Sequence, residues 1–243
     1  MFKILSYDVV DSTNDFLLKN HEKLRNLTVC WALEQRKGRG RKGRYWHSPK
    51  GGLWFSVLFK SKYHVTDPNI YTKIASLSIQ LSLERLRIKN SIIKWPNDIY
   101  VKGKKLAGVL TESILSSNYR TFVVGIGVNV RNEIPDELKE KAVSMKDLVG
   151  DPPDISKVLN LILGKMWKLY NKLGKKTGIA VINRMWKKRL YPKEGQKIMF
   201  IHRGVEKTGE VIKVDQNNLI VKTADGIEKL FDIELILRKD QFT

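Results

Sequence analysis

A short basic segment, residues 36–44, constrains the fold most, because it holds six cations and three glycines in nine residues. Glycine at every second or third position disfavours both helix and strand, and neighbouring cations repel one another unless an anion lies among them. Apolar, strand-like stretches flank the segment at 27–33 and 53–59. We therefore predict a loop held at both ends, disordered without a ligand, whose cations and backbone N–H groups bind a phosphate or a carboxylate.

Two other interpretations of the basic segment remain open at this point. A run of cations is often only a solvated surface, and tracts rich in glycine and arginine also bind single-stranded nucleic acid. A nucleic-acid-binding module would bind bulk DNA or RNA with an affinity that falls steeply with salt. Such a module would leave unexplained the motifs at residues 95–98 and 125–129.

Composition places the chain among ordinary globular proteins. Its 243 residues are 42% hydrophobic, enough for one large domain or for a medium and a small one. Cys30 is the single cysteine and lies in an apolar run, so we expect a buried thiol and a reducing compartment. Uninterrupted apolar stretches of about 18 residues are absent, and the acidic Asp8 comes too early for a secretory signal. We predict a cytoplasmic protein that does not bind membranes.

The net charge of +20 comes from one part of the chain. Residues 1–190 contain 36 Lys or Arg against 16 Asp or Glu, whereas residues 191–243 contain nine of each class. The change in charge predicts a domain boundary near residue 190. We expect an anionic partner, an acidic protein or a nucleotide as readily as a polynucleotide, to bind the amino-terminal domain.

Hydrophobic periodicity predicts helices and strands in mixed order, with a change of texture after residue 195. Ser12 has the position of a helix N-cap, and Asp67-Pro68 is predicted to open a second helix. Strands are expected at 2–10, 27–35, 51–60, 92–94, 106–110 and 122–130, and helices at 68–86, from 154 or 156 to 173, and up to about 190. Short alternating runs at 198–201, 209–214, 219–223 and 228–237 predict a small β-barrel.

The Trp95-Pro96-Asn97-Asp98 motif is predicted to leave the sheet as a loop, because proline cannot extend a strand ladder. Asn97 and Asp98 would then be exposed at a strand end. The motif is either a simple turn, or a site where Asp98 holds Mg²⁺ on a nucleotide phosphate and Asn97 supplies a hydrogen bond.

Further candidate residues lie on the next two apolar strands. Lys105 comes directly before one strand, in which Gly108 lets a ligand or a neighbouring backbone come close. The next strand carries Gly125 and Gly127, which either permit tight packing or leave space for a flat ligand with Asn129 at its rim.

Together, these motifs resemble the biotin protein ligase family in content and order. The matching segments are Asp11-Ser12-Thr13-Asn14, the pattern from Gly38-Arg39-Gly40-Arg41 to Gly51-Gly52-Leu53, Lys94-Trp95-Pro96-Asn97-Asp98, Lys105-Leu106-Ala107-Gly108, and Gly125-Ile126-Gly127 with Asn129. The resemblance implies an α+β catalytic domain at 1–190, with a mixed central sheet, flanking helices and a class II synthetase-like fold. It implies an SH3-like β-barrel at 191–243. Members that also repress transcription carry a winged helix before the first motif. Ten residues precede that motif in this sequence, so the resemblance is to the short type, which does not bind DNA.

The resemblance also implies the reaction and its partners. Biotin and ATP would form biotinyl-5′-adenylate with Mg²⁺ present, and a lysine of a biotin carboxyl carrier protein would then attack the adenylate. By this resemblance, the catalytic residues are Arg41 and Lys105; the biotin-binding residues are Ser12, Thr13, Gln35, Gly38, Arg39, Lys105 and Gly108; the ATP-binding residues are Arg41, Arg44, Trp46, Asn97 and Asn129; and Asp98 is a candidate Mg²⁺ ligand. A lipoate protein ligase, which shares the adenylate chemistry, is the alternative. The sequence leaves open whether the chain forms a homodimer through an exposed sheet edge.

Overall fold

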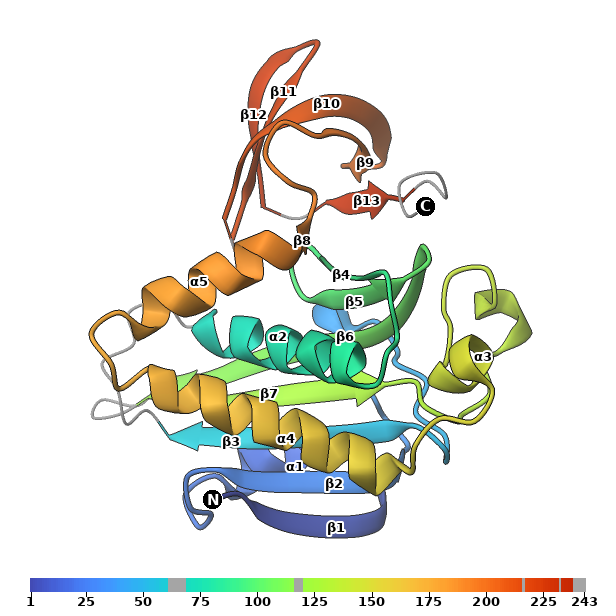
Figure 1. Cartoon of the computed structure of the whole chain (residues 1–243), viewed down its shortest axis with the longest axis vertical. Helices are drawn as coiled ribbons and strands as arrows, with labels where there is room; N and C mark the ends of the chain where they lie inside the picture. Colours follow the sequence, from blue (N-terminus) through green and yellow to red (C-terminus); the bar gives the residue numbers. More distant parts are fainter. Residues whose placement is uncertain (61–68, 116–119, 216, 232, 238–243) are drawn as a thin grey trace.

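An eight-stranded mixed sheet forms the centre of the protein in a computed structural model that describes residues 1–60, 69–115, 120–215, 217–231 and 233–237 (Figure 1). The β1–β2 and β4–β8 pairs are parallel and the others antiparallel. Across the sheet the order is β1 (Lys3–Val10), β2 (Thr28–Gln35), β3 (Leu53–Lys60), β7 (Arg120–Val128), β6 (Lys104–Leu115), β5 (Asp98–Val101), β4 (Ser91–Lys94) and β8 (Leu190–Tyr191). The prediction of an α+β fold with a mixed central sheet is confirmed.

Helices cover both faces of this sheet. Helices α2 (Ile70–Arg85) and α4 (Ile155–Lys172) lie side by side on one face, and α5 (Gly178–Arg189) leads from them to β8 (Figure 1). On the other face, α1 (Thr13–Asn20) packs against β2, β3 and β7. A short helix, α3 (Met145–Val149), follows the 3₁₀ turn η2 (Asp136–Leu138) beyond the end of β7.

Helix α2 is buried on nearly every side, because the sheet covers one face while α4 and α5 cover another. Its serines are compatible with this burial, since each hydroxyl donates to a carbonyl one turn back in the same helix. Ser76 bonds to Thr72, and Ser78 to Ile74, at 3.0 and 2.6 Å. The opening of this helix at Asp67-Pro68, predicted from the sequence, lies outside the described residues.

Helix α4 confirms the amphipathic pattern read from its sequence. Its buried residues are Val158, Leu159, Ile162, Leu163, Met166, Leu169 and Tyr170. These positions recur every three or four residues, so they form one stripe that faces α2 and the sheet.

Two strands of the central sheet were missed by the sequence analysis. The β5 strand starts at Asp98, directly after the turn at Trp95–Asn97, so the predicted loop is shorter than expected. The two-residue β8 pairs with β4 in parallel and continues from α5 without a turn signal. The two strands have only four and two residues, so neither is long enough to show a periodic pattern.

A second, five-stranded antiparallel sheet follows, in the order β12-β11-β10-β9-β13. Its strands are β9 (Lys197–His202), β10 (Val205–Val214), β11 (Leu219–Thr223), β12 (Gly226–Leu230) and β13 (Glu234–Ile236). The strand expected at 228–237 is therefore two strands. No pairing joins β12 to β13 within the described residues, so closure into an SH3-like barrel and the exact domain boundary stay predictions.

Two hydrogen bonds fix this second sheet against the first. The indole Nε1 of Trp95 donates to the Asp215 carbonyl at 2.7 Å, and Nζ of Lys94 donates to the Leu235 carbonyl at 2.8 Å. Both donors belong to the motif that was singled out in the sequence. The motif therefore joins the two sheets as well as forming a turn.

Among the described helices, none is long and apolar enough to cross a membrane. The cytoplasmic location stays a prediction.

We predict that Cys30 does not react with alkylating reagents in the native protein. The thiol is fully buried beneath α1 with Leu17 and Leu58, and burial raises its pKa to about 12. The reactive thiolate is therefore a negligible fraction near pH 8. Mass spectrometry after iodoacetamide treatment should show no modification in buffer and one modification in urea. Equal labelling in both conditions would contradict the burial.

Candidate functional site

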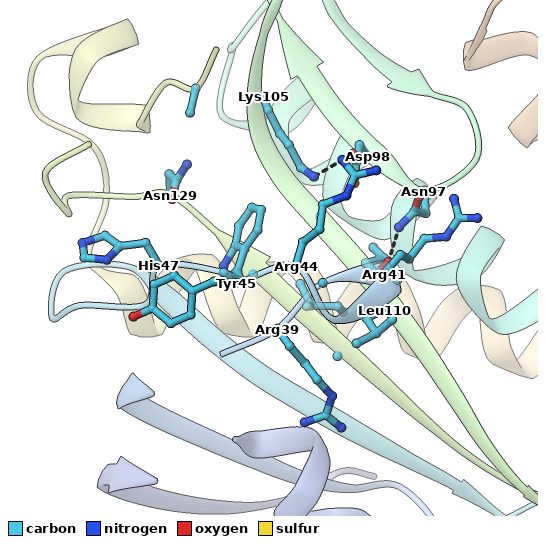
Figure 2. Close-up of a pocket in the computed structure, with 18 of the residues that line it drawn as sticks. Arg39, Arg41, Arg44, Tyr45, His47, Asn97, Asp98, Lys105, Leu110 and Asn129 are labelled. Carbon is cyan, nitrogen blue, oxygen red and sulfur yellow. Dashed lines mark hydrogen bonds and ion pairs between the residues drawn. The ribbon is translucent and has the colours of Figure 1, made fainter. Parts of the chain in front are cut away.

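A cavity of about 440 Å³ lies where the basic segment crosses the ends of the central strands (Figure 2). Its walls come from the start of α1, the basic segment, the turn between β4 and β5, strands β6 and β7, the η2 region and two residues of the second sheet. The predicted site residues that line it are Ser12, Thr13, Gln35, Arg39, Arg41, Arg44, Trp46, Asn97, Asp98, Lys105, Gly108 and Asn129. Residues from seven separate segments of the sequence therefore meet at one place.

Gly38 is the predicted site residue that does not line this cavity. It is buried, and a Cβ atom there would collide with the Ser48 hydroxyl and the Trp46 carbonyl. Its absent side chain therefore allows close packing behind the cavity wall. Its predicted backbone contact with biotin stays a prediction.

The basic segment forms a small hairpin rather than the irregular loop that its composition predicts. The N–H of Trp46 donates to the Gly38 carbonyl at 2.9 Å, and the N–H of Gly40 donates to the Arg44 carbonyl at 2.8 Å. The turn is the 3₁₀ segment η1 (Arg41–Gly43). Glycines at 38 and 40 disfavour this pairing, but the ion pairs of Arg39 with Asp15 and Glu112 stabilise it. Ordering of the segment by a ligand stays a prediction.

A fixed polar network forms the floor of one end of the cavity. The N–H of Thr13 donates to Oε1 of Gln35 at 2.9 Å, the Thr13 hydroxyl lies 3.0 Å from the same oxygen, and Nε2 of Gln35 donates to the Ser48 hydroxyl at 3.0 Å. The Ser12 hydroxyl accepts the N–H of Asp15 at 3.3 Å, which confirms the predicted N-cap of α1. These polar groups hold one another in fixed directions before any ligand enters.

Cations gather at the opposite end. Figure 2 shows Arg44 extending from the hairpin toward Asp98, which pairs with Lys105, and Arg41 extending toward Asn97, whereas Arg39 points the other way. Both Arg41 and Arg44 are exposed. The cavity therefore has a neutral, hydrogen-bonding end and a positively charged end.

Lys105 lies between a carboxylate and an aromatic ring. Its ammonium is 2.6 Å from Oδ2 of Asp98 and 5.0 Å from the centre of the Trp46 ring. Only 27% of the Lys105 side chain and 23% of the Asp98 side chain are exposed. The carboxylate therefore fixes the lysine at the cavity wall, so Asp98 is not the freely exposed strand-end residue that the sequence analysis expected.

Asp98 is the one residue that the sequence analysis names as a Mg²⁺ ligand. The part of the chain that the structure describes contains no group of three or more His, Cys, Asp or Glu side chains that could hold a metal ion. A single carboxylate nevertheless fits Mg²⁺, which is commonly held by one or two carboxylates together with substrate phosphates. Its role as a ligand stays a prediction.

Asn97 and Asn129 are buried at the edge of the cavity. The Asn97 amide donates to the Val109 carbonyl, and the Asn129 amide donates to the Val143 carbonyl at 3.3 Å. Both side chains thus hold neighbouring backbone in place. Contact of either with a phosphate stays a prediction.

The glycines of β7 make room for protein side chains. A Cβ atom on Gly125 would collide with the Asn14 side chain, and one on Gly127 would lie 2.5 Å from Nε1 of Trp46. The structure therefore supports tight packing, the first of the two interpretations of these glycines. Gly127 also shapes the ligand space, because Trp46, which packs against it, forms a wall of the cavity.

Sequence reasoning missed several residues of the site. The aromatic ring of His47 and the apolar side chains of Ile233 and Leu235 line the cavity, and Asn14 was quoted only as part of a motif. Ile233 and Leu235 lie more than a hundred residues from the other site residues, so no local signal could place them there.

Comparison with known proteins gives consistent results. A family model described as the biotin/lipoate A/B protein ligase family matches residues 6–129. The chain is 31% identical over 246 residues to the bifunctional ligase/repressor BirA of Bacillus subtilis, covering 96% of this chain and 74% of that protein. It is 35% identical over 123 residues to a biotin–[acetyl-CoA-carboxylase] ligase of Paracoccus denitrificans, covering 49% and 51% of the two chains.

Solved structures match over nearly the whole chain. A biotin protein ligase from Aquifex aeolicus in complex with biotin and ATP superimposes with a TM-score of 0.80 at 29% identity, covering 98% of this chain and 99% of that one. The match therefore includes both sheets.

We predict that Gly127→Ala destabilises the protein, because the new methyl group displaces the Trp46 indole. Overpacking of this kind costs about 1–3 kcal/mol. Gly164→Ala is the matched control, since Gly164 lies on the exposed side of α4 with nothing within 4 Å of its missing Cβ. That change should stabilise the protein by about 0.5–1 kcal/mol. Urea unfolding measures both, and a stability of Gly127→Ala equal to wild type would refute the contact.

Proposed function

The chain belongs to the biotin/lipoate A/B protein ligase family, and from this membership we propose that it activates biotin with ATP and transfers the biotinyl group to a lysine of an acceptor protein. The observation that carries this proposal is the cavity described above, which has a fixed hydrogen-bonding end and a cationic end. We place the two substrates in it side by side, with the reacting groups between the two ends.

In the first step, two anions must come together. A carboxylate oxygen of biotin attacks the α-phosphorus of ATP, an oxygen–phosphorus bond forms, and pyrophosphate leaves with the electron pair of the broken bond. Lys105 and Arg41 are the cations that we place beside the reacting groups. They offset the repulsion between the anions and the charge that develops in the transition state.

The neutral end suits the ureido ring of biotin. Thr13 and Gln35 present hydroxyl and amide groups, which can donate to the ring carbonyl and accept from its N–H groups. Ser12 lies next to them at the start of α1. Because these groups are already oriented by mutual hydrogen bonds, binding orders few side chains.

We place the adenylate against Trp46, Arg44 and the two asparagines. The Trp46 ring offers a flat apolar wall, and its orientation is fixed by Trp54, whose ring centre lies 6.4 Å away at an interplanar angle of 78°. Asp98 would hold Mg²⁺. When bound, that ion neutralises phosphate charge and orients the leaving pyrophosphate.

In the second step, the amine of an acceptor lysine attacks the acyl carbon of biotinyl-5′-adenylate. An amide bond forms, AMP leaves with the electron pair of the broken carbon–oxygen bond, and the amine nitrogen loses one proton. We propose a biotin carboxyl carrier protein as the acceptor, since a relative is a biotin–[acetyl-CoA-carboxylase] ligase. Lys42, Arg44 and Lys141 at the cavity would attract an acidic acceptor surface.

Two finer features are part of the same proposal. The second sheet would close into an SH3-like barrel, and the protein would form a homodimer through β1. That strand is the edge of the central sheet and exposes Ile4, Tyr7 and Val9. An edge strand with exposed apolar residues is a surface on which a second copy can pair.

Measurement of ATP–pyrophosphate exchange tests the proposed function. We expect exchange with biotin and Mg²⁺, none without an acid substrate, and none with lipoate. Exchange with lipoate alone would make the protein a lipoate ligase. Absence of exchange with both acids, with binding to bulk DNA that weakens steeply with salt, would replace the enzyme by a nucleic-acid-binding module.

We predict that Arg41→Ala slows adenylate formation about 100-fold or more, while biotin binding changes by less than about twofold. Arg41 lies in the exposed turn η1, whereas Thr13 and Gln35 lie on α1 and β2 and bond to each other. Single-turnover kinetics and calorimetry measure the two effects. Arg184→Ala is the control, because Arg184 is exposed on α5 and does not line the cavity. An equal loss of rate and of biotin affinity would show that Arg41 acts elsewhere.

A further inference from the structure

Arg39 differs from the other cations of the basic hairpin. Its guanidinium points away from Arg41 and Arg44, toward α1 (Figure 2), and its side chain is 25% exposed. Nη1 lies 2.8 Å from Oδ2 of Asp15, and Nη2 lies 3.0 and 2.9 Å from the two carboxylate oxygens of Glu112. Two carboxylates therefore neutralise this one cation.

Glu112 continues this contact into the protein. It lies on β6, outside the cavity lining, and its Oε2 accepts the Asn14 amide at 2.6 Å. The Asn14 oxygen in turn accepts the Ser56 hydroxyl at 2.5 Å. Asn14 can occupy this position because Gly125 has no side chain.

The hydrogen bonds then return to the segment from which they started. The Ser56 hydroxyl accepts the Thr13 hydroxyl at 2.6 Å, since its own proton goes to Asn14, and the N–H of Thr13 donates to Gln35 at 2.9 Å. Gln35 is four residues before Arg39. The network therefore forms a closed ring that holds both ends of residues 35–39.

The ring divides the basic hairpin into two parts. Residues 35–39 are attached to α1, β3 and β6 by charged and neutral side-chain hydrogen bonds. The turn at Arg41–Gly43 has no buried residue. Charge-assisted bonds are about twice as strong as neutral ones, so the contacts of Arg39 with Asp15 and Glu112 hold the first part firmly.

We propose that Glu112 is a positioning residue for biotin binding: by fixing Arg39, it holds the backbone of residues 35–39 and the Gln35 amide in the geometry that the ureido end of biotin requires. The proposal rests on the proposed function. It assigns Glu112 no contact with substrate, and it separates the part of the hairpin that binds biotin from the part that supplies cations to the phosphates.

The position requires a carboxylate. Its two oxygens accept three hydrogen bonds from two nitrogens, one from the Asn14 amide and two from Nη2 of Arg39. Burial lowers the pKa of the Arg39 guanidinium, but hydrogen bonds to Asp15 and Glu112 outweigh this effect and the pKa is raised. Arg39 stays charged throughout the accessible pH range, so the contact does not depend on pH through the arginine.

Glu112→Gln tests the proposal, because glutamine keeps the shape and can still accept from Asn14 but loses the charge. We expect KM for biotin in the exchange assay to rise about tenfold or more, while kcat and KM for ATP change by less than about twofold. Biotin affinity measured by calorimetry should fall by the same factor. A merely structural role would lower the active fraction, and so reduce kcat with KM unchanged.

Asp11→Asn is the matched control. It removes the Lys37–Asp11 pair of the same hairpin, whose side chains are 74% and 52% exposed. Exposed ion pairs contribute little, so KM for biotin should change by less than about twofold. An equal effect of Asp11→Asn and Glu112→Gln would overturn the specific role of Glu112.

Arg39→Met provides a second variant in case Glu112→Gln does not fold. It should also raise KM for biotin selectively, and the double variant should be no worse than the poorer single one, because both changes break one contact. Additive effects, or a loss of kcat alone, would overturn the proposal.

Wild-type protein assayed in parallel distinguishes failure of the proposed function from failure of the role of Glu112. Biotin-dependent exchange by wild type, with no selective effect in the variants, refutes only the role of Glu112.

Discussion

The absence of side chains at Gly125 and Gly127 is the constraint on which the rest of the site depends. These two positions of β7 lie in the middle of the central sheet, and they allow Asn14 and Trp46 to lie directly on its surface. Asn14 then reaches Glu112, and Trp46 forms the wall against which Lys105 packs. A methyl group at either glycine would push apart the elements that form the cavity.

The second organising principle is the separate use of positive charge. Arg39 is paired with Asp15 and Glu112, and it holds the base of the hairpin in place. Arg44 extends toward Asp98, which pairs with Lys105, and Arg41 extends toward Asn97. Joining a carboxylate to a phosphate requires cations that are already in position, because reorienting them during the reaction would raise the barrier. The network around Arg39 supplies the fixed base for those cations.

Much of this site could be predicted from the sequence, because its chemistry is concentrated in unusual local patterns. The basic segment, the Trp-Pro-Asn-Asp turn, Lys105 and the paired glycines resemble one family only when taken together, and twelve of the thirteen residues that this resemblance implies line one cavity. The hairpin was not predicted, because cations and glycines disfavour regular structure and the ion pairs that stabilise Arg39 join distant segments. Glu112 was also missed. Its contacts join distant segments, and a glutamate in a strand is ordinarily a solvent-facing residue.

The contribution of the second sheet to the site could not be predicted from local sequence patterns either. Ile233 and Leu235 line the cavity, and hydrogen bonds from Lys94 and Trp95 fix the second sheet there. A sequence pattern can predict short alternating strands, but the surface on which they dock depends on tertiary contacts. The turn at Trp95–Asn97 therefore has three effects: it ends β4, it lines the cavity and it binds the second sheet.

A crystal structure with a non-hydrolysable analogue of biotinyl-5′-adenylate is the most direct test of how the cavity works. We expect the ureido ring to lie against Thr13 and Gln35, the phosphate analogue to lie between Arg41 and Lys105, and the Arg39–Glu112 contact to be unchanged. The opposite orientation, or an analogue bound outside this cavity, would contradict the division into a fixed binding end and a cationic reacting end.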